Sequence, residues 1–127
     1  IIKEEKLATS LFEFVKKCQD LKLEGSIVGI KMHKKNSSYL SFSDNGISIN
    51  INHIFKHNDR QKISLKFQEL HDFVIEKNFK VNIAKDFFFN KESFSQNYNN
   101  SNEFLIKKKY YDKNNLFYSN FFGRITR

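Results

Sequence analysis

Proline and tryptophan are absent from this 127-residue chain, which has only four glycines and one cysteine. A single cysteine excludes an internal disulfide, and Cys18 lies on an apolar helical stripe, where we expect it to be buried. No apolar run is long enough to cross a bilayer. The first residues include neither the basic nor the hydrophobic segment of a signal peptide. We therefore expect a cytoplasmic location.

Phenylalanine and positive charge are abundant instead. The chain contains 15 Phe, 39% hydrophobic residues and a formal net charge of +8. Its length and composition are typical of one globular domain with a single core of modest size. Such a charge raises the question of nucleic-acid binding. The basic residues are spread along the chain, however, and form one tight cluster at Lys107–Lys109. This spacing favours a solvated basic surface over a polynucleotide groove.

The spacing of apolar residues predicts both helices and strands. Apolar positions three or four apart indicate helices, and alternating positions indicate strands. Asp44-Asn45-Gly46 is a turn signal before the second strand. The expected elements are, in order, a helix over 4–21, strands over 26–33 and 46–54, a helix over 59–77, a strand over 79–84, and short helices beginning near Ser93 and Ser101. The polar run 95–102 is predicted to connect these two short helices.

This order of elements predicts an α+β fold. It matches a ferredoxin-like βαββαβ unit, an antiparallel sheet with helices on one face, followed here by C-terminal helices. The first strand is largely missing, because only Ile1 and Ile2 remain of it. That strand normally lies in the middle of the sheet, and its absence leaves backbone groups unpaired. Either a preceding part of the protein or a neighbouring chain pairs with them, so self-association through the open sheet edge is one expectation.

The two longer strands are predicted to have one apolar and one polar face. The apolar face, expected to pack on the helices, consists of Val28, Ile30, Met32, Ile47, Ile49 and Ile51. The polar face consists of Lys31, His33, Ser48, Asn50 and Asn52, with Asn82 from the last strand. These donors and acceptors suit a polar ligand. The alternative is a sheet with one solvated face, which is common in antiparallel proteins.

Several motifs along the chain resemble one family of enzymes. They are IKMHKK from residue 30, LSF at 40–42, GISININHI at 46–54, KVNIAKD at 80–86 and the closing YYDKNNLFYSNFFGRI. These motifs are similar to those in the C-terminal substrate-binding (cap) domain of FAD-dependent oxidases that resemble decaprenylphosphoryl-ribose oxidase, in the vanillyl-alcohol-oxidase-like superfamily. The corresponding motifs of family members are L-K-x-F-G, L-S-F, Y-x-x-K-D and D-P-x-x-x-F-x-S.

The resemblance implies that residues 1–127 are a cap-domain fragment, with an FAD-binding domain of the same protein upstream. The parent enzyme would oxidise a hydroxyl of a sugar or sugar-like alcohol by hydride transfer to the flavin, and the fragment alone would be inactive. Lys85 matches the lysine that lies against flavin and substrate, so it is the expected catalytic and cofactor-binding residue. A cation there stabilises negative charge on the reduced flavin. The expected substrate-binding residues are Lys31, His33, Ser48, Asn50 and Asn82.

The chain departs from the family pattern at several positions. Asn82 replaces the motif tyrosine, His33 an aromatic residue, Asn52 an aspartate and Lys113 a proline. The architecture is therefore better supported than the substrate, and a cap fold that has lost its chemistry is a further alternative. The glycines form no diphosphate-binding motif, so FAD would be held mainly by the other domain. No metal site is expected, because no Cys or His cluster has suitable spacing.

An alternative from another class is a free-standing basic α+β module. Such a module would bind nucleic acid or an acidic partner, and its binding would weaken steeply as salt rises. It would present aromatic side chains interleaved with cations on one exposed face. Most Phe residues instead fall on helical stripes or in the runs near the end of the chain. Nucleic acid is therefore the less favoured partner.

Overall fold

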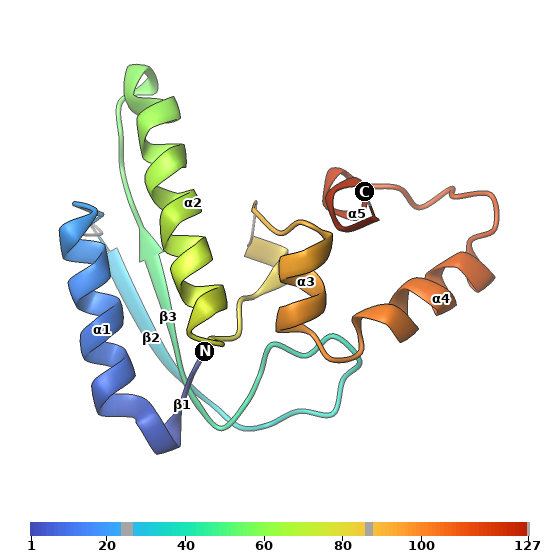
Figure 1. The fold of residues 1–127 in the computed structure, drawn as a ribbon, viewed down its shortest axis with the longest axis horizontal. Coiled ribbons are helices and arrows are strands. Elements are labelled where there is room, and N and C mark those ends of the chain that lie inside the picture. Colours follow the sequence, from blue (N-terminus) through green and yellow to red (C-terminus); the bar gives the residue numbers. More distant parts are fainter. Residues whose placement is uncertain (24–26, 86–87, 127) are drawn as a thin grey trace.

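The computed structural model describes residues 1–23, 27–85 and 88–126. The helices and strands are β1 (Ile2–Lys3), α1 (Leu7–Asp20), β2 (Ile27–His33), β3 (Gly46–Asn52), α2 (Arg60–Glu76), α3 (Lys91–Asn97), α4 (Ser101–Tyr111) and α5 (Asn120–Thr126). Three short 3₁₀ turns are η1 (Glu4–Lys6), η2 (His57–Asp59) and η3 (Ile83–Lys85). The fold is α+β with an antiparallel sheet, as predicted (Figure 1). Within the described ranges, no helix combines the length and hydropathy needed to cross a membrane.

The sheet has the strand order β1-β3-β2, and both pairings are antiparallel. β1 contains two residues and is as short as the sequence predicts. Gly46 begins β3 after the predicted turn, opposite Lys3, with a φ of 155°. A β-carbon at Gly46 would lie 2.0 Å from the carbonyl oxygen of Ile2. Glycine is therefore required where β1 meets β3.

The predicted strand over 79–84 is wrong, because these residues form no strand. Residues 79–81 nevertheless lie beside the start of the chain, in the place of the fourth strand of a ferredoxin-like sheet. The N–H of Lys80 donates to the carbonyl of Ile1 at 3.2 Å, and the Ile1 nitrogen donates to the Lys80 carbonyl. Within the described residues this is the one reciprocal pair, so no ladder forms, and the Phe79 N–H donates instead to the Val74 carbonyl of α2 at 2.8 Å. Residues 83–85 turn into η3. The segment 79–81, β1, β3 and β2 keep the order of a ferredoxin-like sheet.

The outer side of segment 79–81 is satisfied by side chains of α3 and the residue after it. The Asn97 side-chain amide donates to the Phe79 carbonyl at 2.8 Å, and its oxygen accepts from the Val81 N–H at 3.1 Å. The Tyr98 hydroxyl donates to the Val81 carbonyl. Asn97 and Tyr98 are each 3% exposed. The polar run 95–102 is therefore more than the predicted connection, because its side chains replace a neighbouring strand.

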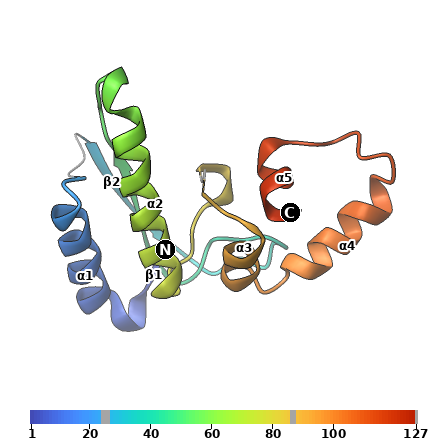
Figure 2. The same ribbon diagram turned by 45° about the horizontal axis from the view of Figure 1, so that its top comes forward.

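Helices α1 and α2 lie over one face of the sheet (Figures 1 and 2). Buried Cys18, Leu23 and Leu70 form a cluster between them, and Ile51 of β3 packs against it. The expected burial of Cys18 is confirmed.

The prediction that the apolar side chains of β2 pack on the helices is wrong. Val28 is 53% exposed, Ile30 61% and Met32 89%. These side chains are exposed because β2 is the outer strand of the sheet, whereas α1 packs mainly against β1 and α2. Alternation indicates which face a side chain occupies, whereas coverage depends on where the helices cross.

A second apolar cluster lies beside the sheet, where the C-terminal helices gather. Its buried residues are Ile75, Phe89, Phe94, Tyr98 and Ile125. Leu40 and Phe42 of the long β2–β3 connection pack against this cluster. Ile75 belongs to α2, whose Leu70 belongs to the first cluster, so α2 joins the two.

We predict that Asn97→Ala destabilises the fold by about 2–4 kcal/mol, because it leaves the Phe79 carbonyl and the Val81 N–H without their partner. Urea unfolding followed by circular dichroism measures this. The matched control is Asn99→Ala at an exposed position two residues away, which should change stability by about 0.5 kcal/mol or less. Equal effects of the two substitutions would contradict the role given to Asn97.

Candidate functional site

Four of the predicted site residues lie on the sheet face away from the helices: Lys31, His33, Ser48 and Asn50. Ile51 packs among helical side chains, so its neighbours Asn50 and Asn52 lie on the other face. Lys31 pairs directly with Ser48 across the strands. The Asn50 amide donates to the Asn52 side-chain oxygen at 3.4 Å. The polar face predicted from alternation is therefore assembled from β2 and β3.

His33 has the most defined surroundings on this face. Its Nε2 lies 2.8 Å from the Ser48 hydroxyl, and its Nδ1 lies 3.4 Å from the Ser43 hydroxyl. The ring also packs edge-on against Phe42, with centroids 5.6 Å apart. A hydroxyl can donate or accept, so both ring nitrogens keep a partner in either protonation state of the imidazole. The half-buried ring is thus fixed in orientation.

Sequence reasoning identified His33 and Ser48 but missed Ser43. Strand alternation cannot find Ser43, because it belongs to the connection between β2 and β3. The available signal was its place directly after the LSF motif, whose Phe42 touches the same ring.

The structure separates Lys85 and Asn82 from the other predicted site residues. The Asn82 side chain accepts from the Ala84 N–H at 3.0 Å, and the Asn82 carbonyl accepts from the Lys85 N–H at 3.0 Å. These bonds form a local turn, and the Lys85 side chain is exposed. The segment before this turn is in the fourth strand position, three strand spacings or roughly 14 Å from β2. Asp86 lies outside the described residues.

Lys80 is a second cation that the sequence did not single out. Its ammonium donates to the Asn97 carbonyl and lies 5.5 Å from the Tyr98 ring centroid. Burial lowers the pKa of Lys80, the nearby charge of Lys3 lowers it further, and Asp44 opposes both. Asp44 itself pairs with Lys3 at 3.4 Å. Lys80 therefore helps to fix the fourth strand position by binding the carbonyl at the end of α3.

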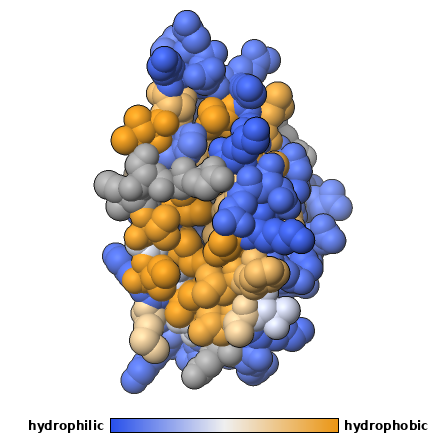
Figure 3. All heavy atoms as spheres, turned by 90° about the vertical axis from the view of Figure 1, so that its left-hand side faces the viewer, coloured by the Kyte–Doolittle hydropathy of each residue, from blue (hydrophilic) through white to orange (hydrophobic). Residues whose placement is uncertain are grey.

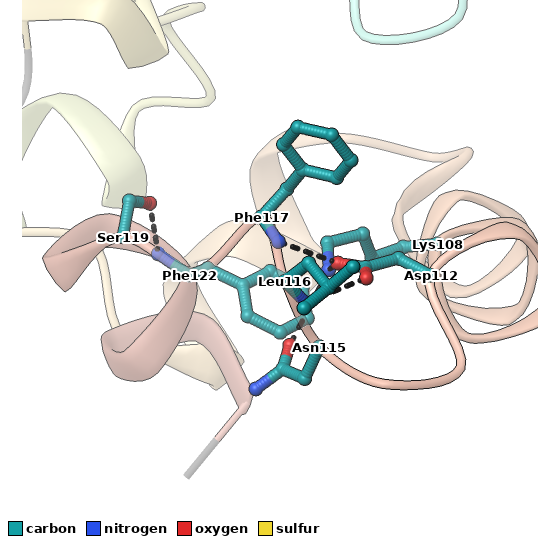
Figure 4. A network of polar contacts seen from close by, with 7 residues as sticks. All are labelled: Lys108, Asp112, Asn115, Leu116, Phe117, Ser119 and Phe122. Carbon is teal, nitrogen blue, oxygen red and sulfur yellow. Dashed lines mark hydrogen bonds and ion pairs between the residues drawn. The ribbon is translucent and has the colours of Figure 1, made fainter.

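The closing motif forms a network of hydrogen bonds that shapes the loop between α4 and α5 (Figure 4). The Asp112 carboxylate accepts from the N–H of Leu116 at 2.7 Å and of Phe117 at 3.0 Å. Lys108 donates to the same carboxylate. Ser119 accepts from the Phe122 N–H at 3.1 Å in the first turn of α5. The aspartate and serine of the family's closing pattern thus have structural roles in this chain.

Beside this loop, aromatic side chains point into solvent. Tyr111 is 81% exposed, Phe117 80% and Tyr110 66%. They line a shallow hollow of about 350 Å³ together with Asp112, Lys113, Asn114 and Leu116.

Arg124 matches an arginine in the pattern of the FAD-dependent oxidases, and it connects α5 to the segment just before α3. Its Nε donates to the Phe89 carbonyl at 3.2 Å, and its guanidinium lies 5.9 Å from the Phe121 ring centroid. Over the described residues, no group of three or more His, Cys, Asp or Glu side chains is placed to hold a metal ion.

We predict that Asp112→Asn lowers the melting temperature at pH 7 and that the difference from wild type vanishes in acid. The hydrogen bond from Lys108 does most to lower the pKa of Asp112, burial opposes it, and the two backbone donors lower it further. A lowered carboxyl pKa stabilises the fold at neutral pH. This contribution shrinks as pH falls below the ordinary value of about 3.9 and is lost below the folded-state pKa.

Melting curves of both proteins between neutral and acidic pH test this. Asp72→Asn, at an exposed position on α2, serves as the control and should follow wild type at every pH. A constant difference between wild type and Asp112→Asn across the pH range would contradict the role of the ionised carboxylate.

Comparison with models of protein families, with curated proteins and with solved structures finds no significant match to this chain. The likeness to FAD-dependent oxidases therefore rests on the sequence motifs alone.

Proposed function

We propose that this chain is the substrate-binding (cap) part of an FAD-dependent oxidoreductase that oxidises a hydroxyl group of a sugar or sugar-like alcohol. The observation that carries the proposal is the polar sheet face, with His33 held between Ser48 and Ser43 and with Lys31 opposite Ser48. Both long helices lie on the other face (Figure 2). A ligand bound by another domain can therefore lie flat against β2 and β3.

The groups on this face suit the oxidation of an alcohol. When bound, FAD supplies the acceptor for the hydride that leaves the hydroxylated carbon. His33 can take the hydroxyl proton through the hydroxyl of Ser48 or Ser43, which lie against its two ring nitrogens, as the carbonyl forms. Lys31 and Asn50 can donate to further hydroxyl groups of a sugar. His33 and Ser48 would thus act on the reacting hydroxyl, while Lys31 and Asn50 orient the rest of the substrate.

The proposal assigns the diphosphate of FAD to a separate FAD-binding domain of the same cytoplasmic protein. None of the four glycines belongs to a motif that cradles a diphosphate. Exposed Lys85 follows the fourth strand position, on the far side of the sheet from β2. From there its charge can face a flavin ring held by that domain and stabilise the reduced form. Asn82, bonded within its local turn, would shape the position of Lys85.

A second candidate function is supported by the exposed aromatic residues near the end of the chain. Tyr110, Tyr111 and Phe117 line the shallow hollow together with Lys113, whose ammonium lies 5.8 Å from the Tyr110 ring centroid. Aromatic faces beside cations are the combination that binds single-stranded nucleic acid by stacking and charge. This observation favours the basic-module alternative and gives it a specific location.

We predict that the protein expressed from its natural start codon, with the residues before Ile1 restored, shows flavin absorbance that bleaches anaerobically with a suitable sugar. Lys85→Ala should slow flavin reduction by about 100-fold, because it removes a charge from the transition state. Lys91→Ala, an exposed lysine of α3, is the control and should reduce at the wild-type rate. A colourless protein that takes up no added FAD would overturn the proposal.

The nucleic-acid candidate predicts that the 127-residue chain binds a fluorescent single-stranded oligonucleotide and loses affinity steeply as salt rises. Tyr111→Ala should weaken this binding by about 10-fold, because one stacked base contributes about 1–3 kcal/mol. Tyr39→Ala, an exposed tyrosine of the β2–β3 connection, is the control. Fluorescence anisotropy over a salt series measures both, and binding that ignores salt or Tyr111 would exclude this candidate.

A further inference from the structure

A large apolar patch lies on one side of the molecule, with hydrophilic side chains around it (Figure 3). It consists of Phe12 and Val15 on α1 with Val28, Ile30 and Met32 on β2, and is called the α1–β2 patch below. Phe12 is 68% exposed, and Met32, at 89%, is the most exposed large apolar residue of the patch. Exposed patches of this kind on folded proteins mark interaction surfaces.

The patch includes the outer edge of the sheet. Among the described strands, β2 pairs with β3 alone and lies at the end of the order β1-β3-β2. Its seven residues contain no proline and carry one charged side chain, Lys31. An edge of this length and composition accepts a further strand through its unpaired backbone groups.

We propose that a second copy of this chain covers the α1–β2 patch, with the two β2 strands paired antiparallel across a twofold axis. The register is set by the sequence of β2. Centring the pair on Ile30 places Ile30 opposite Ile30, Val28 opposite Met32 and Gly29 opposite Lys31. All three apolar residues of each copy then form one uninterrupted row on the helix side.

Neighbouring registers are less favourable. A shift by two residues in one direction places Lys31 opposite Lys31, where like charges repel. A shift by two in the other direction moves Met32 beyond the apolar row. A shift by one residue brings apolar and polar faces together. The alternation of β2 is therefore self-complementary in one register, which is the reason for choosing a second copy as the occupant.

Helix α1 completes the interface. Val28 pairs with Ile51, and Ile51 packs against the cluster that contains Cys18 of α1, so α1 and the apolar row share a face. Pairing of the two β2 strands brings the outer sides of both α1 helices, with Phe12 and Val15, over the joined row. Two charged residues of α1 already have partners on α2 or just after it, because Glu13 pairs with Lys77 at 3.1 Å and Lys17 with Glu69 at 2.6 Å.

The dimer is independent of the proposed function. It buries the helix side of β2 and leaves the opposite face, with His33 and Ser48, accessible. The two ideas can therefore fail separately.

Analytical ultracentrifugation of the 127-residue chain over a range of micromolar concentrations tests the dimer. We expect a mass twice that of the 15.2 kDa chain. Ile30→Lys should raise the dimer dissociation constant about 100-fold or more, because it places two charges in an apolar row. Leu65→Lys, at an exposed apolar position on α2, is the matched control and should leave the dimer unchanged. Circular dichroism verifies that both variants fold.

Single cysteines in a Cys18→Ala background test the register. Directly opposed Cα atoms lie about 4.5–5.5 Å apart in an antiparallel pair, which a disulfide spans. Ile30→Cys should therefore cross-link to itself. Val28→Cys and Met32→Cys should cross-link when mixed but not alone. A chain that stays monomeric at every concentration, or Ile30→Cys that does not cross-link, would overturn the proposal and leave the patch to a different partner.

Discussion

The fold depends on how the chain satisfies the backbone of residues 79–81. This segment has no full strand on either side. Ile1 provides one reciprocal pair of backbone hydrogen bonds, and the Asn97 side chain provides a donor and an acceptor on the other side. Buried amide groups without partners would each cost about 1–3 kcal/mol. Because Asn97 ends α3, the same contacts attach the C-terminal helices to the sheet.

Helical positions followed from the sequence because burial within each long helix repeats along the chain. Ile63 and Leu70 are buried on α2, as their spacing predicts. Contacts between distant segments did not follow. The strand over 79–84 was wrong because a strand needs a partner of similar length, and β1 is too short to provide one. The sequence predicts only a polar connection over 95–102. Its composition does not reveal that the side chains of Asn97 and Tyr98 bind buried backbone groups of residues 79 and 81.

The sequence likewise predicts the positions of some residues of the candidate site and not of others. Lys31, Ser48 and Asn50 share a face because alternation in two adjacent strands is a local property, and the structure reproduces it. The separation of Lys85 from them follows from the ferredoxin-like strand order, because residues 79–81 and β2 lie at opposite ends of the sheet. Ser43 reaches His33 from a connection whose path is set by Leu40 and Phe42 packing on the second cluster. The polar face is therefore shaped partly by residues far from it.

Helix α2 contributes Leu70 to one apolar cluster and Ile75 to the other, within little more than one helical turn. If this turn of α2 unwound to open one apolar cluster, it would also expose the other cluster. We therefore expect the two clusters to open together and not one at a time. The backbone amides near residues 70–75 lie where the clusters join, so they should be among the slowest to exchange with solvent.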